Sequence, residues 1–149
     1  MNTAHSIGVV GGSGGVGASV LTAAIAVRAA QMGLRPVCLD GDRLGGGLDV
    51  TLGIEQERGV RWPDLAGARG RIDGPELLRR LPSVDGVSVL SFDRARDVRL
   101  NIETVQEVFH AVSLAADLVG AIVNDEAVLA DDPQNKMPAF MWVQSGMDL

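Results

Sequence analysis

The residues with the most chemical content form a glycine-rich turn near the amino terminus. Five glycines occur within residues 11–17, between an apolar run and an alanine-rich stretch with helical character. A strand, a glycine loop and a helix in this order make an anion site, because loop amides and the helix amino terminus point at one volume. Against the pattern G-x-x-x-x-G-K-[ST], both glycines and the hydroxyl are present, and an alanine stands at the lysine. We therefore predict that a phosphate is bound by Gly12, Gly14, Gly15, Val16, Gly17, Ala18, Ser19 and Val20.

Two carboxylates, Asp40 and Asp42, follow the next apolar run, and two kinds of ligand compete for the combined site. Gly12-x-Gly14-x-x-Gly17 with Asp40 fits a dinucleotide-binding fingerprint, in which the acid binds a ribose. In a P-loop protein the same acids help to hold Mg²⁺ and the attacking water, and Ser19 supplies a metal-binding hydroxyl. The chain contains no Tyr, so a dinucleotide-binding oxidoreductase fragment would lack the catalytic Tyr-x-x-x-Lys pair of short-chain dehydrogenases.

The elements that must position these residues alternate along the chain. Apolar runs predict strands at 7–10, 35–40, 87–92 and 118–123, and helical patterns cover 19–32, 75–81 and 101–116. Glycine-rich loops are expected around residues 45–47 and 59–74. Strands that alternate with helices predict an α/β fold with a mostly parallel sheet flanked by helices.

The chain divides unevenly. We expect residues 1–130 to form one domain and residues 131–149 to form an irregular C-terminal tail, because periodicity ends there.

Composition restricts the partners. Residues 1–99 carry twelve Arg and eleven acids, whereas residues 100–149 carry one Lys and eight acids. With a pI near 4.8, the chain is not expected to bind nucleic acid, which requires a basic face. The Arg side chains between 58 and 80 are expected at the surface, Asp49 is expected to cap a helix or to lie at the surface, and Cys38 is expected in the core. No apolar stretch is long enough to span a membrane and no signal peptide is evident, so we expect a cytoplasmic protein.

Four segments together resemble one superfamily. Residues 13–19 resemble the deviant Walker A loop of the MinD/ParA ATPases. Residues 39–53, with Asp-x-Asp, a glycine run and Leu-Asp, resemble the second motif of its CpaE-like pilus-assembly branch. Residues 59–65 and 90–94 are similar to actinobacterial CpaE-like proteins, also called septum-site-determining (Ssd-like) proteins.

The resemblance implies a P-loop NTPase fold of the SIMIBI class, and a switch that binds ATP or ADP with Mg²⁺. Its partners would be proteins of the division machinery or of a Flp/Tad-type pilus or secretion apparatus, together with a second copy in a homodimer. The protein would act in the cytoplasm, peripherally at the inner face of the membrane. Carried over by residue, Gly14, Gly15 and Gly17 would cradle phosphates, Asp40 and Asp42 would be catalytic, and the metal ligands would be Ser19, Asp42 and Asp125.

This sequence also departs from the superfamily. Ser13 stands where the signature lysine would reach across a dimer, and Ala18 stands at the P-loop lysine. Without these charges we expect ATP hydrolysis to be negligible. In the superfamily a later apolar run ends in an aspartate that continues as Asp-Leu-Pro-Arg. Here Asp125 follows Asn124, and that continuation is absent. The chain is shorter than a full domain of the superfamily, so the fold is expected to be truncated, and a nonfunctional truncated product is a further alternative.

Overall fold

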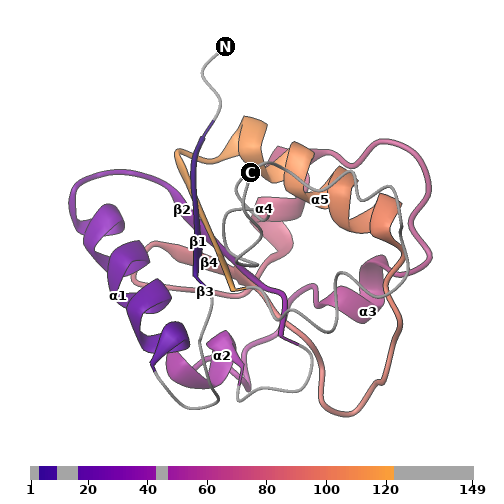
Figure 1. Ribbon diagram of the computed structural model, residues 1–149, viewed down its shortest axis with the longest axis horizontal. Helices are drawn as coiled ribbons and strands as arrows, with labels where there is room; N and C mark the ends of the chain where they lie inside the picture. Colours follow the sequence, from indigo (N-terminus) through magenta and orange to yellow (C-terminus); the bar gives the residue numbers. More distant parts are fainter. Residues whose placement is uncertain (1–3, 10–16, 43–46, 123–149) are drawn as a thin grey trace, which may run out of the picture.

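A computed structural model describes residues 4–9, 17–42 and 47–122 of the 149. Within these ranges the chain forms a five-stranded sheet with the order β1-β5-β2-β4-β3 (Figure 1). The strands are β1 (His5–Val9), β2 (Pro36–Asp40), β3 (Ser83–Val84), β4 (Val87–Leu90) and β5 (Leu118–Ile122). All neighbours pair in parallel except β3 and β4, which form an antiparallel hairpin at one edge. The predicted α/β fold with a mostly parallel sheet is confirmed.

Helices cover both faces of this sheet (Figure 1). One face packs against α1 (Ala18–Gln31), which also contacts α2 (Leu48–Thr51). The other face packs against α5 (Ile102–Ala115), which contacts α4 (Gly74–Arg80), and α3 (Trp62–Leu65) lies near the end of β2.

Alternate strand residues enter two cores. On β2, Val37 and Leu39 face the α4 and α5 side, whereas Cys38 faces α1. All five β2 residues are buried, as expected for a parallel strand covered on both faces. The prediction that Cys38 is a core residue is therefore confirmed.

The longer helices begin and end at the residues that local chemistry favours. Asn101 caps α5 by accepting a hydrogen bond from the Glu103 amide (2.9 Å). Asp73 caps α4 in the same way through the Glu76 amide (2.9 Å). Gly33 follows α1 with a φ of 84°, the left-handed conformation of a helix C-terminus.

Two parts of the sequence prediction were incomplete. The segment expected to be a loop, 59–74, contains the short helix α3 and the first residue of α4. The two-residue strand β3 was missed, although the Asp-Gly turn at 85–86 is a hairpin signal. Both turn residues have positive φ, 51° at Asp85 and 81° at Gly86. The proposed tail, residues 131–149, lies outside the described residues.

No helix among the described residues has both the length and the apolar character that crossing a bilayer requires.

Candidate functional site

The register of the sheet brings the two sequence motifs to one edge. Val9 at the end of β1 is aligned with Ile122 on β5, and Ile122 is aligned with Asp40 at the end of β2. The Gly41 amide continues the ladder by donating to the Ile122 carbonyl (2.7 Å). Because these strands are parallel, the glycine loop after β1 and the acidic motif after β2 leave the sheet from the same side. Ligands of open α/β sheets bind outside this carboxyl edge.

The part of the glycine loop that the structure describes is its helical end. Gly17 is in the left-handed region, with φ 88° and ψ 15°, a conformation that favours glycine. Among the described residues no side chain caps α1, and its first turn, Ala18 to Val20, contains no acid. The amides of this turn therefore retain the capacity to bind an anion. The other predicted phosphate-binding residues, Gly12, Gly14, Gly15 and Val16, lie outside the described residues.

The start of α1 is held close to the sheet. The Thr22 hydroxyl donates to the Ala18 carbonyl (2.8 Å) and is buried. A Cβ on Gly120 of β5 would lie 3.3 Å from the Thr22 methyl group, so glycine permits this close packing. The Ser19 residue at this end of the helix is half-buried.

Both side-chain oxygens of Asp40 accept hydrogen bonds from backbone amides. Asp40 is 2 % exposed, and its Oδ1 and Oδ2 accept hydrogen bonds from the amides of Asp42 (3.0 Å) and Leu48 (2.9 Å). These two bonds tie together both ends of the loop that follows β2. The predicted catalytic role of Asp40 stays a prediction, and the observed contacts are those of a residue that shapes the loop. Asp42 is half-buried, at the edge where the glycine loop begins.

Burial also affects the titration of this carboxyl. It raises the pKa of Asp40 to about 6 from an ordinary 3.8, and the hydrogen bonds from Leu48 and Asp42 oppose that rise. The negative charges of Asp42 and Asp49 raise it further.

Unfolding experiments should detect this shift. The folded chain binds the Asp40 proton more tightly than the unfolded chain, so this stabilisation is complete below pH 3.8 and lost as pH rises through about 6. A shift of that size corresponds to about 3 kcal/mol. We expect the difference in unfolding free energy between wild type and Asp40→Asn to fall with pH between 4 and 6, and to be level above 7. Urea titrations across this range measure the difference. A difference that does not change with pH would contradict a raised pKa of Asp40 in the folded chain.

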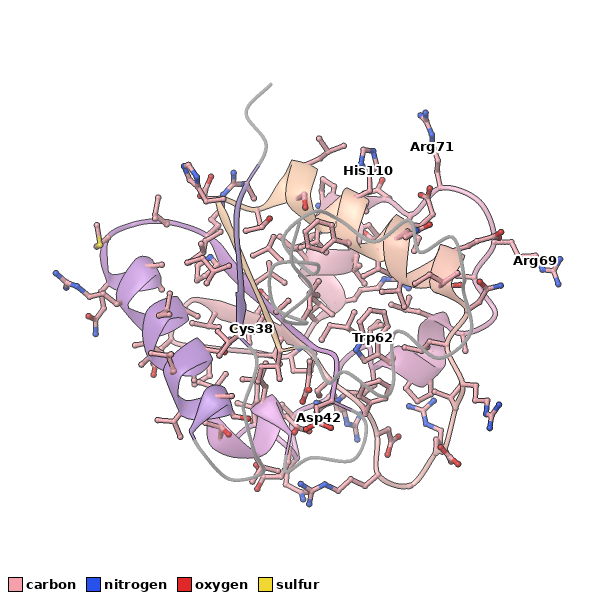
Figure 2. All side chains as sticks on the ribbon, in the orientation of Figure 1. Cys38, Asp42, Trp62, Arg69, Arg71 and His110 are labelled. Atoms are coloured by element: carbon pink, nitrogen blue, oxygen red, sulfur yellow. The ribbon has the colours of Figure 1, made fainter. Side chains whose placement is uncertain are left out.

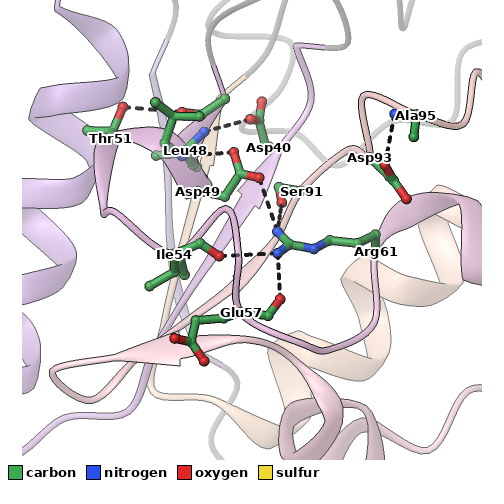
Figure 3. A network of polar contacts seen from close by, with 12 residues as sticks. Asp40, Leu48, Asp49, Thr51, Ile54, Glu57, Arg61, Ser91, Asp93 and Ala95 are labelled. Carbon is green, nitrogen blue, oxygen red and sulfur yellow. Dashed lines mark hydrogen bonds and ion pairs between the residues drawn. The ribbon is translucent and has the colours of Figure 1, made fainter.

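A buried polar network lies next to the loop that follows β2 (Figure 3). The Arg61 guanidinium forms an ion pair with Asp49 (Nη1 to Oδ2, 3.1 Å) and also donates to Ser91 Oγ (2.5 Å). Its Nη2 donates to the carbonyls of Ile54 (3.2 Å) and Glu57 (3.0 Å). Asp49 and Arg61 are each only 7 % exposed. The expectation that Arg61 lies at the surface was wrong, and Asp49 is a buried acid in the first turn of α2 and not a surface residue. Both can be buried because each charge is compensated by the other.

The neighbouring Trp62 connects the ends of two strands. Its indole Nε1 donates to the Asp40 carbonyl (2.8 Å), and its amide donates to the Ser91 carbonyl (3.0 Å). The ring is 3 % exposed and lies 6.1 Å from the Phe92 ring, centroid to centroid. Figure 2 shows Trp62 in the interior, whereas Arg69 and Arg71 project outward, as was expected of them.

Only two of the three predicted metal ligands are among the described residues. Among the described residues, no group of three or more His, Cys, Asp and Glu side chains is arranged to hold an ion. Mg²⁺ in nucleotide sites usually takes one or two carboxylates and completes its shell with phosphate oxygens and water, so Ser19 and Asp42 suffice in kind. Asp125 follows β5 and lies outside the described residues.

Comparison with solved structures identifies the fold. A ParA family ATPase from Chlorobium tepidum superposes with a TM-score of 0.69 at 19% identity, covering 83% of this chain and 54% of that one. MinD from an Aquifex aeolicus MinC:MinD complex gives 0.62 at 23% identity, covering 83% and 49%. The chain therefore has the fold of the MinD/ParA P-loop ATPases.

No family model matches this chain, but sequence comparison finds relatives. An uncharacterised protein of Mycobacterium tuberculosis, found in two strains, is 40% identical over 105 residues, 70% of this chain. An uncharacterised ATP-binding protein of Methanocaldococcus jannaschii is 30% identical over 127 residues, 82% of this chain. The chain spans 29% of the mycobacterial relatives and 44% of the archaeal one.

The strand order decides between the two ligand classes that the sequence left open. In dinucleotide-binding folds the first and second strands of the parallel sheet are neighbours. Here β5 separates β1 from β2. The dinucleotide-binding alternative is therefore not supported by the fold.

Proposed function

We propose that this chain is a MinD/ParA-type switch that binds ATP or ADP together with Mg²⁺. The observation that carries the proposal is the aligned register of Val9, Ile122 and Asp40, which delivers the glycine loop and the acidic motif to one edge. The fold and the archaeal ATP-binding relative support the same conclusion.

The residues present suit this ligand. The open first turn of α1 would bind phosphate oxygens through its amides, together with the rest of the glycine loop. Mg²⁺ would be held by Ser19 and Asp42, with Asp125 as a further carboxylate, and would screen the charge on the phosphates. Asp40 would keep the Asp42 segment in place through its backbone contacts.

The biological role that we propose is narrower than the fold. The resemblance to CpaE-like and Ssd-like proteins favours septum-site determination, or positioning of a Flp/Tad-type pilus or secretion system. The solved MinD neighbour is in complex with MinC, which supports a role exercised through protein partners and, in this proposal, through a homodimer. We place the protein in the cytoplasm, peripherally at the inner face of the membrane.

Calorimetric titration with ATP tests the site. We expect Mg²⁺-dependent binding by the wild type, and a loss of about tenfold or more in affinity for Ser19→Ala and Asp42→Ala, because each removes a ligand of the metal. The matched controls are Ser83→Ala on the exposed edge strand and Glu55→Gln on the surface, which should bind as the wild type does.

Two outcomes would contradict the proposal. Binding that is unchanged by both site variants would remove the assigned residues from the site. Quenching of NADH fluorescence by the protein, without any ATP binding, would revive the dinucleotide class.

A further inference from the structure

The two partners of the Arg61–Asp49 ion pair are both buried, and neither is among the residues assigned to the proposed nucleotide and metal site. Removing a guanidinium from water costs free energy that the ion pair only partly recovers, and apolar residues of similar volume often serve stability equally well. Here the guanidinium makes four separate contacts, to one carboxylate, one hydroxyl and two carbonyls (Figure 3). Such a set specifies position more than it adds stability.

The position that it specifies is that of α2. This helix has four residues, too few to be stable without tertiary contacts. Asp49 Oδ2 is held by Arg61, and Asp49 Oδ1 accepts the Val50 amide (2.9 Å). A Cβ on Gly47 would clash with Asp49 Oδ1, so the entry to α2 is packed against the same carboxylate.

From α2 the contacts continue to the proposed metal site. The Leu48 amide, next to Asp49 in the chain, donates to Asp40 Oδ2 (2.9 Å). The Asp42 amide donates to the other oxygen of the same carboxylate (3.0 Å). Arg61 is thus connected to Asp42 by three ion-pair or hydrogen-bonded links and by the adjacent residues Leu48 and Asp49, with no exposed side chain between them.

The far side of Arg61 is fixed to the sheet. Ser91 directly follows β4, and its hydroxyl accepts from the guanidinium while its carbonyl accepts the Trp62 amide. Ser91 is fully buried. The guanidinium therefore links the end of β4 to the α2 segment, which also packs against α1.

We propose that Arg61 is a positioning residue for Mg²⁺-bound nucleotide, and that it acts through Asp49 to hold the Asp40–Asp42 segment ready before the ligand arrives. The proposal rests on the proposed function. Preorganisation of this kind lowers the cost of ordering a site when the ligand binds. It predicts that Arg61 contributes to the Mg²⁺-dependent part of nucleotide affinity and not to the part that the glycine loop supplies alone.

The test compares ATP affinity in Mg²⁺ with ATP affinity in EDTA, for Arg61→Lys and Asp49→Asn. Lysine keeps the charge but cannot make four directed contacts, and asparagine keeps the shape without the charge. We expect each variant to lose about tenfold in the Mg²⁺ condition and less than about twofold in EDTA. The control is Arg35→Met, which removes an exposed ion pair with Asp117 and should change neither affinity.

Hydrogen exchange supplies a readout that does not depend on nucleotide. The Leu48 amide should exchange at least about tenfold faster in Arg61→Lys, because α2, which carries this donor, is held less firmly. The Val89 amide of β4 donates to the carbonyl of Pro82, the residue before β3 (2.9 Å), and should exchange at the wild-type rate.

The outcomes separate this inference from the proposed function. If the wild type binds ATP without any effect of Mg²⁺, the proposed metal site fails and the inference fails with it. If the wild type shows the Mg²⁺ effect and both variants keep it, only the inference is overturned. Equal losses with Mg²⁺ and with EDTA, or failure of both variants to fold cooperatively, would assign the pair to fold stability alone and overturn the inference.

Discussion

Purified protein is expected to release phosphate from ATP no faster than a protein-free solution containing Mg²⁺. Ser13 and Ala18 occupy the two positions where the superfamily that this chain resembles carries lysines. Charge that develops on a transferred phosphoryl group would then lack both lysines, and loss of such a cation costs several powers of ten in rate. Continuous phosphate-release assays with and without EDTA measure this turnover.

Other cations of α1 do not replace the lysines. Arg28 is nine residues beyond Ser19, about 14 Å along the helix, and its Nη1 donates to Gln31 at the far end (3.5 Å). Robust Mg²⁺-dependent turnover that Asp42→Ala abolishes would show that another group compensates, and would contradict a binding switch.

Restoring one lysine should have a large effect on binding. Ala18→Lys places an ammonium group at the start of α1, where it could reach the bound phosphates as in other P-loops. A charge-assisted hydrogen bond of this kind is worth about 1.5–3 kcal/mol, so ATP affinity should rise by about tenfold or more. Ala24→Lys, on the exposed face of the same helix, adds the same charge farther from the loop and is the control. Equal affinities for the two variants would argue against phosphate binding at Gly17 and Ala18.

The elements of the sheet were largely predictable because they depend on local patterns. The apolar runs around Val37 and Val119 became strands with nearly the expected ends, since parallel strands buried on both faces are continuously apolar. The order of the strands was not predictable in the same way. That β5 enters between β1 and β2 depends on how α5 crosses the sheet, and no local signal in residues 118–122 encodes it.

The candidate site shows the same division. Asp40 and Asp42 were identified from their place after a strand, and parallel pairing then brings them near the glycine loop. Asp49 and Arg61 were missed because charged residues are usually exposed, and burial became favourable only when residues 12 positions apart met each other. Residues 50–60 between them are of mixed polarity and include several charged side chains, so no local signal marked the pair.

Trp62→Ala should be among the most destabilising single substitutions in the described part of the chain. The ring is buried in the core cluster on the α5 side, and truncation of a buried Trp costs about 3–5 kcal/mol through lost transfer free energy and the cavity left behind. Urea unfolding followed by far-UV circular dichroism measures the loss. Val50→Ala, at a large apolar side chain that is 42% exposed, is the control and should change the unfolding free energy by less than about 0.5 kcal/mol.

Trp62→Phe separates the hydrogen bond from the packing. Phenylalanine keeps an aromatic ring near Phe92 but removes the Nε1 donor, which leaves the Asp40 carbonyl without this partner at the end of β2. We expect a loss of about 1–3 kcal/mol, clearly smaller than for alanine. Because that carbonyl belongs to the residue that holds the Asp42 segment, Mg²⁺-dependent ATP affinity should also fall in this variant. A Trp62→Phe protein that is as stable as the wild type and binds ATP equally well would show that the indole contributes volume alone. The end of β2 would then be held by the Arg61 contacts and the strand pairing, without the indole hydrogen bond.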